Sequence, residues 1–220
     1  MSSPQETAFR PSRTLLGKTP SALVAALHGR WRRVLTASYY RWFFESIGAG
    51  SVLYGGSSII NSELISIGRN TLIRHGSRLE VVLHGQPWRP SMSIGNDVNI
   101  EQNVHIVCHD RVIIGDKVSI APRCAIMDTT HPPGAALHGI KIGSVLDRRR
   151  SGVSIGENSL IGTGTTIMPN VSIGKNCLIA AGSLVINSIP DNSIAGGMPA
   201  RVLRRLDALT DQLDGSESIG

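Results

Sequence analysis

Aliphatic residues recur every six positions along most of this chain. A small or β-branched residue follows most of them four positions later, as Val98 follows Ile94. The aliphatic positions are Ile94, Ile100, Ile106, Ile114, Ile120 and Ile126, and then Ile155, Ile161, Ile167, Ile173, Ile179 and Val185. An amphipathic helix repeats near every 3.6 residues and a half-buried strand every two. A period of six instead predicts a parallel β-helix, in which each repeat forms one flat face of a coil.

The spacing of the repeats also predicts how successive coils stack. Three six-residue faces make a coil of about 18 residues, whereas Ile94 and Ile114 are twenty residues apart. The two extra residues lie within 107–113, so we expect a bulge there, around His109 and Asp110. This bulge should lie one coil away from His131, which ends a third face.

Two stretches interrupt the repeat and are expected to form loops. Residues 84–93 contain two prolines and Trp88, which either stacks on a sugar ring or packs against the wall of the coil. Residues 132–152 leave the repeat directly after His131 and include three consecutive arginines, 148–150. The arginines are either a solvated patch or a binding site for an acidic or phosphorylated partner. A long excursion from a compact repeat is usually functional or disordered.

The N-terminal part of the chain differs in composition from the repeat. Residues 1–20 are rich in Ser, Thr and Pro and are predicted to be disordered. Residues 21–46 carry Leu23, Leu27, Trp31, Leu35 and Trp42 together with Arg30, Arg32, Arg33 and Arg41, which predicts a basic amphipathic helix. This helix either packs on the end of the β-helix or lies on an anionic membrane surface. The β-helix domain is expected over 47–206, followed by a flexible tail over 207–220.

Charge and composition narrow the class of protein. The chain has 220 residues and a net charge of +6, and residues 1–50 carry seven of the Lys and Arg residues against Glu6 and Glu45. No nucleic-acid-binding motif accompanies this basic segment, and the pattern of a signal peptide or a long apolar run is not recognised, so we expect neither secretion nor a membrane span. Cys108, Cys124 and Cys177 are interpreted as reduced packing residues. We expect one domain in the cytoplasm, with peripheral contact at the inner face of the membrane left open.

Two segments carry a resemblance to a known family. They are DTTHP, residues 128–132, and IGTGTTIMPNVSIGKNCLIAAGSLVINSIPDNSIAGGMPARVLRRL, residues 161–206. With the repeat, they resemble the hexapeptide acyltransferases of polysaccharide and lipopolysaccharide O-acetylation, which are similar to maltose and galactoside acetyltransferases. The resemblance implies an all-β, left-handed parallel β-helix and homotrimers with sites between subunits. It also implies transfer of acetyl from acetyl-CoA, without a metal, to a sugar hydroxyl of a surface polysaccharide or its precursor.

The candidate catalytic residues centre on His131. Neutral imidazole can take the proton of an attacking hydroxyl and return it to the thiolate. Asp128 either holds the second nitrogen of His131 or shapes a turn. Where the galactoside enzymes have an assisting asparagine, this chain has Glu101, which we expect to reach His131 from a neighbouring subunit. Asn103 is a candidate substrate-binding residue with a structural turn role as its alternative.

The resemblance also indicates a path for the acetyl donor. Thr163, Ala181 and Gly182 match positions along the pantetheine, and Arg201 and Arg204 match positions near the phosphates. Guanidinium groups bind phosphate well. The Thr-Lys pair of many relatives is replaced here at residues 186 and 187, so phosphate binding is expected to be weaker or differently arranged.

Two alternatives to an acyltransferase remain. The first is a non-catalytic β-helix scaffold. The second is a γ-carbonic-anhydrase-like zinc enzyme, which needs three histidine ligands across subunits. The spacing of His105, His131 and His138 does not match that pattern, because Ala136 stands where the nearest partner of His131 would be.

Overall fold

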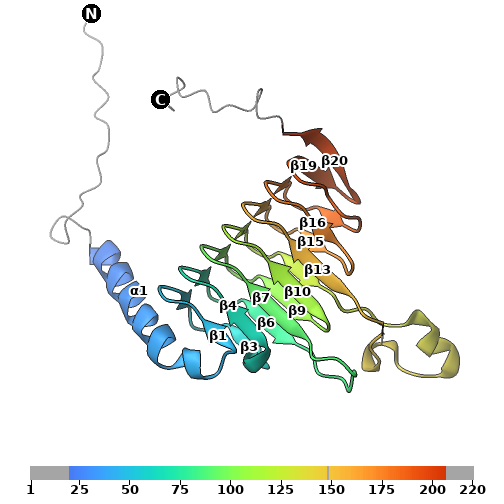
Figure 1. Cartoon of the computed structure of the whole chain (residues 1–220), viewed down its shortest axis with the longest axis horizontal. Coiled ribbons are helices and arrows are strands. Elements are labelled where there is room, and N and C mark those ends of the chain that lie inside the picture. Colours follow the sequence, from blue (N-terminus) through green and yellow to red (C-terminus); the bar gives the residue numbers. More distant parts are fainter. Residues whose placement is uncertain (1–19, 148, 207–220) are drawn as a thin grey trace, which may run out of the picture.

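The computed structural model describes residues 20–147 and 149–206, and these form a stack of coils with one helix beside its first coil (Figure 1). Each coil contributes one short strand to each of three sheets, and successive coils add parallel neighbours. The first sheet contains β1 Ser46–Ile47, β4 Ile65–Ile67, β7 Ser91–Ile94, β10 Arg111–Ile114, β13 Gly152–Ile155 and β16 Ser172–Ile173.

The second sheet closes the C-terminal end of the stack. Its last two strands pair antiparallel, whereas its other neighbours pair parallel. It contains β2 Val52–Leu53, β5 Leu72–Ile73, β8 Asn99–Ile100, β11 Ser119–Ile120, β14 Leu160–Ile161, β17 Leu178–Ile179, β19 Ser193–Gly197 and β20 Ala200–Arg205.

The third sheet is the one from which the 132–152 excursion departs. It contains β3 Ser58–Ile60, β6 Arg78–Val81, β9 His105–Cys108, β12 Ala125–Met127, β15 Thr166–Ile167 and β18 Leu184–Val185. The excursion itself holds two 3-10 helices, η4 Pro133–His138 and η5 Ile142–Ser144, and projects from the side of the stack (Figure 1). A further 3-10 helix, η3 Ser62–Leu64, lies in an early coil.

The repeat positions fill the inside of the stack, as the periodicity predicts. Each of the twelve repeat positions is at most 2% exposed. Ile106 pairs in register with Ile126, and Ile94 with Ile114, which confirms the expected stacking. Cys108, Cys124 and Cys177 are buried and free, in agreement with a packing role. Because neighbouring coils bury each other's aliphatic faces, the core runs continuously along the stack.

The helix begins and ends differently from the prediction. Helix α1 spans Pro20–Ser38, and the chain then forms the 3-10 helix η2 Tyr40–Trp42 before entering β1. The Ser38 hydroxyl donates to the carbonyl oxygen of Val34, 2.7 Å away, a local hydrogen bond that competes with continuation of a helix. The prediction of one helix to residue 46 is therefore too long, and Trp42 lies beyond α1. The predictions for 1–19 and 207–220 concern residues outside the described ranges.

Candidate active site

His131 lies just after β12, where the excursion leaves the third sheet, and its side chain is exposed. Its Nδ1 lies 2.7 Å from the carbonyl oxygen of Val145, which is on the returning arm of the excursion. A carbonyl oxygen can only accept, so Nδ1 carries the hydrogen and Nε2 keeps its lone pair. The excursion thus fixes the tautomer in which Nε2 can act as a base.

The two arms of the excursion are joined at their base. The backbone N–H of Asp147 donates to the carbonyl oxygen of Thr130, 2.9 Å away, beside the contact between His131 and Val145. Two adjacent cross-links therefore hold the returning arm against the departing one. The position of the imidazole depends on the whole excursion rather than on its immediate neighbours in the chain.

The returning arm is also fixed to the bulge of the preceding coil. The Arg150 guanidinium donates to both carboxylate oxygens of Asp110, over 3.1 and 2.9 Å, and the Ser151 backbone N–H donates to Asp110 over 3.1 Å. Burial raises the pKa of Asp110, but the hydrogen bond and charge of Arg150 outweigh it and hold that pKa below its ordinary value. The expected bulge is confirmed, since His109 and Asp110 form the turn between β9 and β10.

Asp128 is placed under this turn and does not face His131. Its carboxylate accepts the backbone N–H groups of His109, Asp110 and Arg111 at 2.5, 2.8 and 2.7 Å. Burial raises the pKa of Asp128, and the three backbone donors partly offset that rise. The Ser151 hydroxyl donates to the Asp128 carbonyl oxygen. Of the two roles expected for Asp128, the geometry matches the turn, because Val145 holds the second nitrogen of His131.

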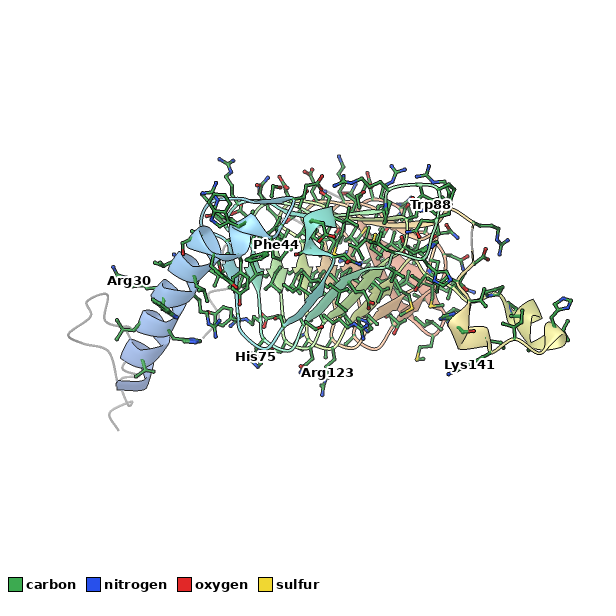
Figure 2. All side chains as sticks on the ribbon, turned by 90° about the horizontal axis from the view of Figure 1, so that it is seen from below. Arg30, Phe44, His75, Trp88, Arg123 and Lys141 are labelled. Carbon is green, nitrogen blue, oxygen red and sulfur yellow. The ribbon has the colours of Figure 1, made fainter. Side chains whose placement is uncertain are left out.

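Trp88 packs against the same bulge. Its Nε1 donates to the carbonyl oxygen of His109 over 3.2 Å, and its ring meets the His109 ring edge-on with centroids 5.4 Å apart. The Arg150 guanidinium lies 5.7 Å from the centre of the Trp88 indole. Trp88, which is labelled in Figure 2, is thus half-buried where the two loops meet. This corresponds to the packing alternative.

Glu101 and Asn103 lie away from His131 within one chain. Glu101 follows β8 in the second sheet and forms an ion pair of 2.9 Å with Arg74 of the previous coil. Asn103 has a φ of 58° and forms a left-handed corner between the second and third sheets, a conformation that asparagine tolerates. The structure therefore shows the turn role of Asn103, and a single chain does not bring Glu101 to the imidazole.

The donor residues divide into two groups on the C-terminal coils. The Gly182 backbone N–H donates to the carbonyl oxygen of Thr163, 2.8 Å away, so this corner brings Thr163, Ala181 and Gly182 together. Gly182 has a φ of +68°, and a Cβ added there would meet open space. Arg201 and Arg204 stand on β20, where both are exposed. Ala181 and Gly182 are exposed at this corner, and the arginines supply positive charge one strand further on.

Several residues of the site carried no signal for sequence reasoning. Val145 contributes only a backbone carbonyl, for which no side-chain motif exists. Asp110 and Arg150 are 40 residues apart, and their pairing depends on the path of the excursion. Arg149 binds Asp147, and Arg148 lies outside the described residues. Two arginines of the run, Arg149 and Arg150, therefore form ion pairs with aspartates of the same chain. Within 20–147 and 149–206, no three His, Cys, Asp or Glu side chains gather to hold a metal ion.

Comparison with known sequences supports the reading of the repeat. Residues 152–187 match the family described as bacterial transferase hexapeptide (six repeats). Galactoside O-acetyltransferase of Escherichia coli (strain K12) is 38% identical over 53% of this chain and 55% of its own length. The inferred lipopolysaccharide biosynthesis O-acetyl transferase WbbJ of the same organism is 28% identical over 67% of this chain and 74% of its own length. The chain spans about half the length of the first curated relatives it matches.

Solved structures show the same fold. AntD, an N-acyltransferase from Bacillus cereus in complex with dTDP and 3-hydroxybutyryl-CoA, superposes with a TM-score of 0.65 and 22% identity, over 78% of this chain and 88% of AntD. The relatives are named acetyltransferases, and this neighbour is an acyltransferase in complex with a coenzyme A thioester. Residues 152–187 therefore carry the bacterial transferase hexapeptide repeat, and the chain has the left-handed β-helix fold of these acyltransferases.

Proposed function

We propose that this protein is an acetyl-CoA-dependent O-acetyltransferase acting on a sugar hydroxyl of a surface polysaccharide or its precursor. The observation that carries the proposal is the hydrogen bond between His131 Nδ1 and the Val145 carbonyl oxygen, 2.7 Å long. It leaves the Nε2 lone pair on an exposed side chain, where an acceptor hydroxyl can approach. The galactoside and lipopolysaccharide names of the relatives support a sugar as acceptor.

The proposed acetyl transfer uses only His131, the acceptor hydroxyl and the thioester of the donor. His131 Nε2 takes the hydroxyl proton of the acceptor as its oxygen bonds to the thioester carbonyl carbon. The carbon–sulfur bond then breaks, and the imidazolium returns the proton to the thiolate, which gives an acetyl ester and free coenzyme A. A positioned general base contributes about 10²- to 10⁴-fold to such a rate.

The acetyl donor is proposed to lie along the C-terminal coils. The open, exposed surface at Gly182 leaves room for a pantetheine chain, and Arg201 and Arg204 suit the phosphates of the donor. Ala181 adds no bulk at this corner.

A homotrimer is proposed to complete the site. Glu101 pairs with Arg74 in its own chain and leaves the second sheet, whereas His131 leaves the third. A neighbouring subunit in a closed ring supplies the same Glu101 from the opposite side. There its carboxylate would bind a sugar hydroxyl or support the imidazolium.

The test incubates the purified full chain with acetyl-CoA and a panel of sugars, including amino sugars because AntD is an N-acyltransferase, and follows free thiol. We expect thiol release that depends on a hydroxyl acceptor. A requirement for an amino group would overturn O-acetylation. The scaffold alternative predicts that acetyl-CoA leaves the thermal unfolding midpoint unchanged, whereas the proposal predicts an increase.

A further inference from the structure

Helix α1 contacts the β-helix through its polar side. The backbone N–H of Leu53 donates to the Thr36 hydroxyl over 3.0 Å, and the His28 ring lies 6.0 Å from the Tyr54 ring. The Arg32 guanidinium lies against Gly55, where an added Cβ would come within 2.3 Å of it. His28, Arg32 and Thr36 are four residues apart and form one stripe along the helix. Over residues 28–36, α1 is thus docked by polar side chains, with Leu35 half-buried beside them.

The opposite stripe of α1 is apolar and exposed. Val24 is 67% exposed, Leu27 56%, Trp31 62% and Val34 58%, and their spacing of three and four residues places them on one face. A helix of a globular protein normally turns such a stripe toward its core. Here the usual orientation is reversed, so this apolar stripe is available to a partner outside the chain.

Positive charge lies beside the apolar stripe. Arg30 and Arg33 are exposed, and both border a groove between α1 and the first two coils, together with Val52, Tyr54 and Leu72. No Asp or Glu occurs between residues 20 and 44. The chain also presents an exposed aromatic side chain beside a basic one after α1, because Trp42 is 81% exposed and Arg41 precedes it.

We propose that α1 and the turn after it form a docking surface for an anionic lipid bilayer. The apolar stripe would enter the boundary between headgroups and acyl chains, and the arginines would contact lipid phosphates. Tryptophan side chains are enriched at this boundary in membrane proteins. No helix among the described residues is long and apolar enough to cross a membrane.

Charge favours a bilayer over a second copy of the chain. Two α1 helices packed side by side would bring together two segments that both carry net positive charge. No acidic residue of the segment would compensate this charge. An anionic bilayer neutralises the same charges. The surface is independent of the proposed acetyl transfer, and it would hold the enzyme beside lipid-linked acceptors.

The test is flotation of the full chain with vesicles of phosphatidylcholine alone or mixed with phosphatidylglycerol. The variant Leu27→Glu with Trp31→Glu should weaken binding to the mixed vesicles roughly 100-fold or more. Arg30→Gln with Arg33→Gln should weaken it roughly 25-fold, since each basic residue near an anionic surface contributes about 5-fold. Leu203→Glu, at the other end of the stack and 66% exposed in the parent, is the matched control and should bind as the parent does.

The proposal is supported if the parent chain binds the mixed vesicles and both double variants lose that binding. Failure of the parent chain to float, or equal flotation of the parent and the Leu27 and Trp31 variant, would overturn it. Light scattering on the same samples tests the alternative that a second copy of the chain binds the apolar stripe. If the Leu27 and Trp31 variant were a smaller oligomer than the parent, the stripe would belong to an interface between copies.

Discussion

The guanidinium of Arg150 and the carboxylate of Asp110 form two parallel hydrogen bonds across 40 residues of sequence. Asp110 belongs to the bulge of one coil and Arg150 to the end of the excursion that starts after His131. The pair therefore fixes the returning arm whose Val145 carbonyl orients the imidazole. Arg150 is a positioning residue in this account, because it acts on His131 through the backbone.

Replacing Arg150 should reduce catalysis without abolishing donor binding. In Arg150→Met, the Asp110 carboxylate loses its two charged donors, and we expect kcat to fall about 10- to 100-fold because the imidazole is less well placed. The KM for acetyl-CoA should stay within about twofold, and Arg150→Lys should recover part of kcat. Steady-state thiol release measures both constants. Arg149→Met, which removes a guanidinium that is 87% exposed, is the control. A large rise in KM with unchanged kcat would contradict the positioning role.

The same pair predicts how stability depends on pH. The folded-state pKa of Asp110 is lowered, so its contribution is present above the unfolded pKa near 3.9 and is lost as pH falls through the folded value. Asp110→Asn should therefore unfold about 1–3 kcal/mol more easily than the parent at pH 7. The difference should shrink below about pH 4. Denaturant titrations at both pH values measure it, and a difference that does not change with pH would refute the assigned cause.

Asp128→Asn separates a turn role from a catalytic one. The amide keeps one acceptor oxygen and places N–H groups against backbone donors that need a partner. We expect a loss of about 1–3 kcal/mol in unfolding free energy. The pH profile of kcat/KM should keep the same midpoint, because Val145 holds His131. A shifted midpoint would show that the carboxylate acts on the imidazole.

The sequence predicted the repeating part of this molecule well, and the site less completely. Burial of an aliphatic residue at every sixth position leaves one stacking register, so the pairing of Ile106 with Ile126 follows from counting. The place of His131 at the end of the third sheet follows in the same way. The excursion has no repeat, and its contacts join backbone groups and charges distant in sequence. Amphipathic helices normally turn their apolar side toward the core, but α1 turns its polar stripe toward the first coil, where it contacts Leu53 and Tyr54.

Subunit mixing tests whether Glu101 and His131 of one site come from different chains. Glu101→Ala and His131→Ala should each be nearly inactive alone. Trimers refolded from equal amounts of both should regain about one quarter of parental activity, because random mixing pairs an intact Glu101 with an intact His131 at that frequency in a cyclic assembly. Mixing without refolding is the control. No recovery from refolded mixtures of confirmed size would place both residues in one chain.

The most direct test of the central claim is the rate of thiol release by His131→Ala with an accepted sugar. His138→Ala, an exposed histidine of the same excursion, is the matched control and should retain the parental rate. If His131 Nε2 is the base, its loss should lower kcat about 10²- to 10⁴-fold at neutral pH. A His131→Ala rate equal to that of the parent would contradict the account.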